Sequence, residues 1–119
     1  MKICQLETEN GFCADRIEIA DSYLTRLKGL MFRKALGKGE GLLLKKCSSI
    51  HCCFMNFPID VVYLCDNMEV LKVETVRPWR VGSIVRGAKH ILELPEGAAS
   101  SLRRGDRIIM KEVDTRNVQ

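Results

Sequence analysis

Alternation of apolar and polar positions predicts short strands along most of the chain. Near the amino terminus, Asn10-Gly11 separates two strand-like runs, and this dipeptide in such a setting is the strongest short-range signal for a β-hairpin. We therefore expect a hairpin over about residues 2–19. The alternation over residues 16–19 places both isoleucines of its second strand on one face, which should pack inward.

Helical spacing replaces this alternation after the first hairpin. Apolar residues then recur at intervals of three and four, as in an amphipathic helix; they are Tyr23, Leu24, Leu27, Leu30 and Met31. Asp21 or Ser22 can cap the first turn, so the pattern predicts a helix over about residues 22–31. A second short helix is predicted over residues 96–102, directly after Pro95.

The middle of the chain, residues 48–64, holds two apolar runs that meet at Phe57-Pro58 and predict a second hairpin. After the turn signal Asp66-Asn67, further strands are expected over residues 70–75, 90–94 and 107–113, followed by a frayed tail over residues 114–119. The expected fold class is mostly β (a β-rich α+β protein). It would be a compact antiparallel barrel or sandwich of short strands with one or two short helices.

Length and charge narrow the possible functions. The 119 residues fit a single globular domain, which we place at residues 1–113. The net charge of +4 is spread along the chain without a block of like charges, which argues against a nucleic-acid partner. No apolar run approaches the roughly 18 residues of a membrane span, and no signal-peptide pattern occurs. We therefore expect a cytoplasmic protein with no membrane partner.

The six cysteines are interpreted as reduced, buried side chains that act as small hydrophobic residues. No CxxC pair occurs, and adjacent Cys52 and Cys53 would point to opposite faces of a strand. Most of the thiols also lie within apolar runs. We accordingly predict no cofactor and no resident metal.

The first run of the central hairpin carries an unusual set of side chains. Read as a strand, it places Ser49, His51, Cys53 and Met55 on one face. The last three could bind a soft metal such as copper or zinc. Side chains two residues apart on a strand stand about 7 Å apart, however, which is too far for adjacent ligands without a bend.

Catalysis is an alternative interpretation of the same hairpin. His51 and Asp60 could form an acid–base pair across the turn, with Cys53 or Ser49 as the nucleophile. Asp60 could equally accept hydrogen bonds from backbone amides, and nothing in the sequence marks an oxyanion site. The balance favours a protein that is not an enzyme.

The favoured interpretation is a non-catalytic binding module with a cleft around the central hairpin. Apolar side chains would form the floor of the cleft, and arginines, among them Arg80 and Arg86, would supply positive charge. Such a mixture suits a small anionic ligand, or the carboxylate of a peptide or protein partner. The residues expected to line the cleft are Arg26, Arg33, His51, Met55, Asp60 and Trp79.

Several of these residues lie in motifs that closely resemble the domain-of-unknown-function family 192. The most specific are Arg26-Leu27-Lys28-Gly29-Leu30-Met31-Phe32-Arg33 and Phe57-Pro58-Ile59-Asp60-Val61-Val62, accompanied by Ser49-Ile50-His51 and Pro78-Trp79-Arg80. The resemblance extends from about Ala14 to Met110. It implies a small, largely β protein of bacteria and archaea, sometimes exported, with no established activity. Cys52 and Cys53 depart from the family pattern, which weakens a thiol or metal mechanism for the family as a whole.

Overall fold

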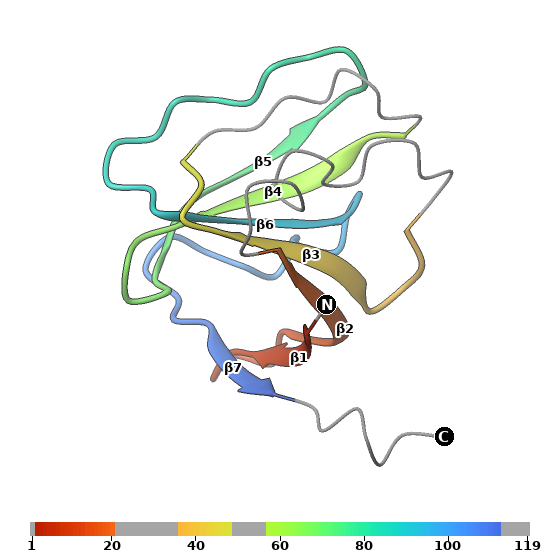
Figure 1. The fold of residues 1–119 in the computed structure, drawn as a ribbon, viewed down its shortest axis with the longest axis vertical. Helices are drawn as coiled ribbons and strands as arrows, with labels where there is room; N and C mark the ends of the chain where they lie inside the picture. The colour runs from red at the N-terminus through yellow and green to blue at the C-terminus, as the bar shows by residue number, and fades with distance from the viewer. Residues whose placement is uncertain (1, 21–35, 49–56, 113–119) are drawn as a thin grey trace.

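The chain forms one curled, seven-stranded β-sheet in a computed structural model that describes residues 2–20, 36–48 and 57–112 (Figure 1). The strands follow the order β5-β4-β6-β3-β2-β1-β7 across the sheet. Their bounds are β1 (Lys2–Glu7), β2 (Cys13–Ala20), β3 (Glu40–Lys45), β4 (Ile59–Leu64), β5 (Val70–Val76), β6 (His90–Pro95) and β7 (Ile109–Glu112). The mostly β fold class is thereby confirmed.

Five of the six strand pairs are antiparallel, as expected. The first hairpin is confirmed, since β1 and β2 pair from Lys2–Ile19 to Glu7–Cys13 around a turn in which Gly11 has a φ of 102°. The exception to the antiparallel pattern is the pairing of β2 with β3, which is parallel. Parallel neighbours require a crossover, and this one runs through residues 21–39, between the two strands in the sequence.

Both faces of the sheet are covered, which explains the apolar sequences of the central strands. All six residues of β4 are buried, as are the first five of β6. Strands enclosed on both faces read as continuous apolar runs rather than as alternating patterns. One core lies inside the curl and includes Cys4, Leu6, Ile17, Leu43, Val62, Leu92 and Leu102; the other lies on the opposite face and includes Ala20, Leu42, Leu44, Val61, Tyr63 and Ile91.

Backbone hydrogen bonds draw the two edges of the sheet together at one end. The amide of Val70 donates to the carbonyl of Asp106 over 2.8 Å, the amide of Gly105 donates to Val70 over 2.8 Å, and that of Ile108 donates to Met68 over 2.9 Å. These bonds link the start of β5, at one edge, to the segment that enters β7, at the other. The sheet is therefore a half-barrel with its edges tied at one end.

Close packing explains the glycine at the second position of β3. A Cβ atom on Gly41 would lie 2.6 Å from the carbonyl oxygen of Glu93, 2.8 Å from Ile17 Cδ1 and 2.9 Å from Leu94 Cδ2. Contacts below about 3 Å are far inside the normal separation of non-bonded carbon atoms. Any larger residue at this position would push β3 away from its neighbour β6.

The predicted helix over residues 96–102 is wrong. The segment is a series of turns in which Ala98, Ser100 and Leu102 donate to carbonyls three residues earlier. Gly97 adopts a φ of 87°, which is outside the right-handed helical region. Ala99 and Leu102 nevertheless insert into the core within the curl, so these turns cover one opening of the half-barrel.

Three other expectations fall on residues that the structure does not describe: the helix over 22–31, the first run of the central hairpin and the tail over 114–119. The remaining strand predictions are confirmed with small shifts, the last strand beginning at Ile109 rather than at residue 107. Among residues 2–20, 36–48 and 57–112, no helix has the length and hydropathy needed to span a bilayer.

Candidate functional site

Asp60 lies on β4 with both carboxylate oxygens engaged by the protein. The residue is 4% exposed. Its Oδ2 accepts the amides of Gly97 and Ala99, each over 3.0 Å, and its Oδ1 accepts the Thr75 hydroxyl over 2.9 Å. The carboxylate thus pins the turns after β6 to two neighbouring strands, and it offsets its own desolvation by these bonds.

This environment bears on the proposed acid–base role of Asp60. A general base needs a free acceptor lone pair that faces the proton to be removed. Here, Oδ2 accepts two backbone amides and Oδ1 accepts the Thr75 hydroxyl, so the protein uses most of the acceptor capacity of this buried carboxylate. The contacts are those of a structural carboxylate, and no observation on the described residues favours catalysis.

A second carboxylate, Glu74 on β5, anchors the long loop between β5 and β6. The Ser83 amide donates to Glu74 Oε2 over 2.8 Å, and the Ser83 hydroxyl donates to Oε1 over 2.9 Å. The Tyr63 hydroxyl from β4 also donates to Oε2, and Lys72 Nζ reaches the Ser83 hydroxyl over 3.0 Å. One side chain of the sheet therefore holds the middle of the loop in place.

The charge of Glu74 is stabilised by these contacts. Burial raises the pKa of Glu74, but the hydrogen bonds from Tyr63 and Ser83 and the positive charge of Lys72 lower it by more in total. The pKa is therefore below its usual value of 4.5, and the carboxylate is ionised at neutral pH.

The segment that Glu74 anchors, residues 77–86, is called here the Trp79 loop. It forms the long excursion between β5 and β6 at the top and left of Figure 1. Trp79 is 68% exposed, and its φ of 65° lies in the left-handed region, which an aromatic residue adopts only at a cost. Val81 is 63% exposed and Ile84 is 93% exposed. Large apolar side chains are therefore held at the surface.

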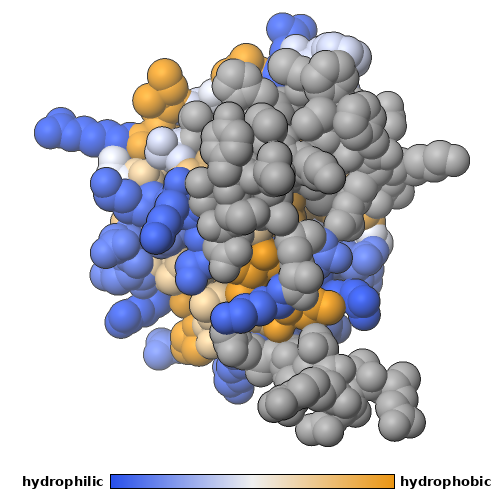
Figure 2. Space-filling view, in the orientation of Figure 1, coloured by the Kyte–Doolittle hydropathy of each residue, from blue (hydrophilic) through white to orange (hydrophobic). Residues whose placement is uncertain are grey.

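The Trp79 loop is also positively charged. No Asp or Glu occurs between Glu74 and Glu93, whereas the stretch contains three arginines and one lysine. Arg77, Arg80 and Arg86 are exposed, and none of them forms a side-chain hydrogen bond or ion pair with the described part of the chain. The described surface in Figure 2 is mostly hydrophilic, with apolar residues emerging in a few separate places.

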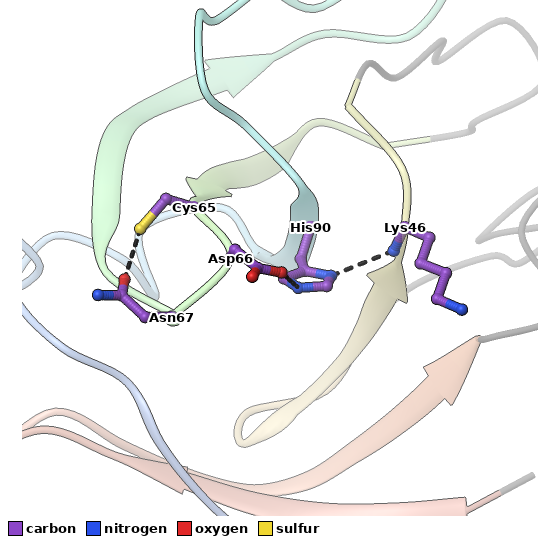
Figure 3. A network of polar contacts seen from close by, with 5 residues as sticks. All are labelled: Lys46, Cys65, Asp66, Asn67 and His90. Carbon is purple, nitrogen blue, oxygen red and sulfur yellow. Dashed lines mark hydrogen bonds and ion pairs between the residues drawn. The ribbon is translucent and has the colours of Figure 1, made fainter.

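His90 begins β6 and is held in its neutral form. Its Nδ1 accepts the backbone amide of Lys46 over 3.1 Å, and its Nε2 lies 4.0 Å from Asp66 Oδ1 (Figure 3). Burial lowers the pKa of His90, and Lys45 lowers it further; the carboxylate and backbone of Asp66 raise it by less. The ring therefore accepts at Nδ1 and carries its proton at Nε2 at neutral pH.

The four cysteines in the described part of the chain differ in exposure. Cys4 is buried, as expected, but Cys13 is exposed, and Cys47 and Cys65 are partly buried. All four are reduced thiols. The Cys65 thiol donates to Asn67 Oδ1 over 2.6 Å and points away from His90 in Figure 3. The expectation of uniformly buried thiols is therefore wrong for Cys13. Within the described ranges, no three His, Cys, Asp or Glu side chains could share a metal ion.

A cavity of about 310 Å³ lies at the end of the sheet where its two edges are tied together. It is lined by the β1–β2 turn and by residues 105–109. Asn10 donates to Asp106 Oδ2 over 2.9 Å, and the Arg103 amide donates to the same oxygen over 2.8 Å. Its polar side chains thus mainly tie the first turn to the segment that enters β7.

Of the predicted cleft residues, the structure describes Asp60 and Trp79. Asp60 is buried under the turns of residues 97–99, and Trp79 lies at the surface. Arg26, Arg33, His51 and Met55 are outside the described residues, as are Cys53 and Ser49. The predicted cleft as a whole therefore stays a prediction.

Sequence reasoning missed Glu93, the most deeply buried acidic residue in the described chain. It is 2% exposed at the centre of β6, opposite Leu42 on β3 and Val61 on β4. One signal was present, because Glu93 is a lone charge inside an apolar strand run between His90 and Pro95. A carboxylate in that position must be compensated by partners or by a proton.

These features define a small β protein built on a curled sheet, with a charged and apolar loop fixed to one end of its edge strand. Residues 5–110 match the model of the family DUF192, described as "Uncharacterized ACR". The chain belongs to this family, which confirms the resemblance of its motifs. The family description assigns no activity, so membership establishes the fold and leaves the function open.

Archaeal relatives support the same assignment. The UPF0127 protein PH1112 of Pyrococcus horikoshii is 37% identical over 107 residues, which cover 86% of this chain and 93% of that protein. The UPF0127 protein PF1050 of Pyrococcus furiosus is 40% identical over 100 residues, covering 78% and 86% respectively.

Two bacterial crystal structures share the fold. A protein of unknown function from Novosphingobium aromaticivorans has a TM-score of 0.75 at 20% identity, covering 90% of this chain and 83% of its own. A protein from Sinorhizobium meliloti, described as a candidate transcription regulator, has a TM-score of 0.76 at 21% identity, covering 92% of both chains. At these identities the likeness concerns the fold alone.

Proposed function

We propose that the protein is a non-catalytic binding module for an anionic ligand or partner, and that the Trp79 loop is part of its binding surface. The observation that carries the proposal is the exposure of Trp79, which is 68% accessible in a left-handed conformation. A costly backbone conformation that holds an apolar side chain in water is most easily explained if the side chain serves an interaction.

The arginines of the Trp79 loop indicate that the ligand is negatively charged. The arginines on either side of Trp79 have no ion-pair partner in the described part of the chain, and a guanidinium group offers a fork of donors that fits a carboxylate or a phosphate. In this proposal, Arg26, Arg33, His51 and Met55 contribute to the same binding surface. Asp60 contributes indirectly, because its Oδ2 accepts the amides of Gly97 and Ala99 and so fixes those turns.

The single tryptophan of the chain makes the proposal testable by fluorescence. Wild-type protein is titrated with inorganic phosphate and with a short acidic peptide that has a free terminal carboxylate. We expect a saturable change in Trp79 emission that weakens with added salt and in the variant Arg80→Gln, but not in Arg104→Gln, which removes an exposed arginine from a distant turn.

A second measurement covers ligands that the titration does not sample. Protein isolated from its own cells is analysed by native mass spectrometry for added mass, alongside His51→Ala and Arg80→Gln variants prepared in the same way. A bound molecule that is lost in the variants supports the proposal. A bare chain, together with a flat titration for every probe, would overturn it.

A further inference from the structure

Three of the four large apolar side chains that are strongly exposed in the described chain lie on the Trp79 loop: Trp79, Val81 and Ile84; the fourth is Ile109 on β7. Single exposed apolar residues are normal on protein surfaces. Three within six consecutive positions are a concentration that requires its own explanation. A small anion would use the arginines and an aromatic face, but it gives no reason for an isoleucine that is 93% exposed.

The apolar side chains are displayed by a segment that is already ordered. Ser83 lies between Val81 and Ile84, and both its amide and its hydroxyl are bound by Glu74 at 2.8 and 2.9 Å. Tyr63 and Lys72 hold the same network from the sheet side. Because the loop is fixed before a partner arrives, little conformational entropy is lost when it binds.

We propose that the Trp79 loop docks a segment of a partner protein that carries both acidic and apolar side chains. The inference rests on the proposed function and adds the class of partner. Charge complementarity supports it, because the exposed Arg77, Arg80 and Arg86 alternate with the apolar residues along the loop and no carboxylate occurs between residues 75 and 92. Trp and Arg are also the residue types that contribute most to protein interfaces.

Two other macromolecules fit these observations less well. A nucleic acid would account for the arginines but not for the exposed Val81 and Ile84. An anionic membrane surface attracts the compact charge of lysine as well as the guanidinium group of arginine, so it does not explain why the loop carries arginines. The guanidinium groups can pair in two-bond geometry with the carboxylates of acidic side chains, as they can with phosphates, and it is the combination of Trp with Arg that is typical of protein interfaces.

The test is a selection from a random-sequence peptide display library on the full-length chain. We expect the enriched peptides to combine Asp or Glu with large apolar residues. A synthetic copy of an enriched peptide should bind about tenfold more weakly to Ile84→Ser and to the double variant Arg77→Gln/Arg80→Gln. Matched controls, Ile109→Ser and Lys38→Gln/Arg104→Gln, should bind like wild type, and circular dichroism checks that every variant is folded.

The outcomes separate this inference from the broader proposal. If Ile84→Ser binds the peptide as wild type does while the arginine variant is weakened, the partner inference is overturned and anion binding stands. If neither variant changes binding, both are overturned. The inference is also overturned if the selection enriches no peptides that combine acidic and apolar residues. It is overturned likewise if, in place of peptide binding, the protein shows Ile84-dependent binding to phosphatidylserine vesicles or arginine-dependent binding to double-stranded DNA.

Discussion

Replacement of Asp60 by alanine removes the acceptor for three hydrogen bonds at once. A hydrogen bond to a charged group contributes about 1.5–3 kcal/mol, and a buried donor left without a partner costs about 1–3 kcal/mol. The bond from Ala99 is buried, whereas those from Gly97 and Thr75 are partly buried and can be replaced by water. Because one carboxylate serves all three donors, we expect a total loss of about 3–5 kcal/mol in the free energy of unfolding.

Asparagine at the same position is the matched control. Its amide oxygen can accept the two backbone amides, while its NH₂ group donates to the Thr75 hydroxyl, which turns to become an acceptor. We expect Asp60→Asn to lose about 1–2 kcal/mol. Urea unfolding followed by far-UV circular dichroism measures both variants against wild type.

The two variants can refute the reasoning in different ways. If Asp60→Ala loses less than about 1 kcal/mol, the carboxylate does not stabilise the fold as its contacts indicate. If Asp60→Asn is destabilised as much as Asp60→Ala, the charge and not the hydrogen-bond geometry is what matters. Amide hydrogen exchange at Ala99 adds a local readout, since its protection should fall in the alanine variant even where global unfolding changes little.

Three further predictions concern other parts of the sheet. His90 has a folded-state pKa below 6.5, so its stabilising contribution is present above that pH and is lost as pH falls through the folded pKa. The variant His90→Asn keeps an acceptor for the Lys46 amide and should flatten the fall in the urea midpoint between about pH 7 and pH 5. An unchanged pH profile would contradict this. Glu74→Gln should cost about 1–2 kcal/mol at neutral pH and remove the part of the stability that wild type loses as pH falls below 4.5. Acid titration of the unfolding transition measures both effects. Ser83→Ala should destabilise the protein by a similar amount but keep the pH dependence of wild type. Gly41→Ala should destabilise by about 1–3 kcal/mol because its new methyl group would meet a β6 carbonyl oxygen 2.6 Å away; an alanine variant as stable as wild type would mean that β3 moves freely.

Local signals in the sequence predicted the elements that depend on adjacent residues. The first hairpin follows from Asn10-Gly11 and its alternating flanks, and the turn between β4 and β5 follows from Asp66-Asn67. The segment after Pro95 was misassigned because its conformation depends on a residue far away in the sequence. Gly97 takes a left-handed φ, and its amide bonds the carboxylate of Asp60, 37 positions earlier. Helix propensity depends on the local residues and does not include the effect of such a distant partner.

The candidate site was less predictable than the fold. The sequence marked Trp79 and its arginines as chemically distinct, but exposure and the anchoring of Ser83 by Glu74 are properties of the assembled loop. Which strands pair with one another in the sheet was also not predictable from the sequence. The parallel contact of β2 with β3, and the burial of Glu93 between β3 and β4, follow from strand order, which alternation along the chain does not encode.

The position of β6 has a consequence for how the chain is made. This strand lies between β3 and β4 and provides the connection between them in the sheet, although it is the sixth in sequence order of the seven strands that the structure describes. Until residues 90–95 have left the ribosome, β5-β4 and β3-β2-β1 are separate pieces, each with an apolar strand edge unpaired. Assembly of the sheet therefore depends on contacts between segments that are distant in the sequence, and such contacts form slowly. A chain that stops before residue 90 would expose the edges of β3 and β4, so such truncated products should aggregate rather than fold.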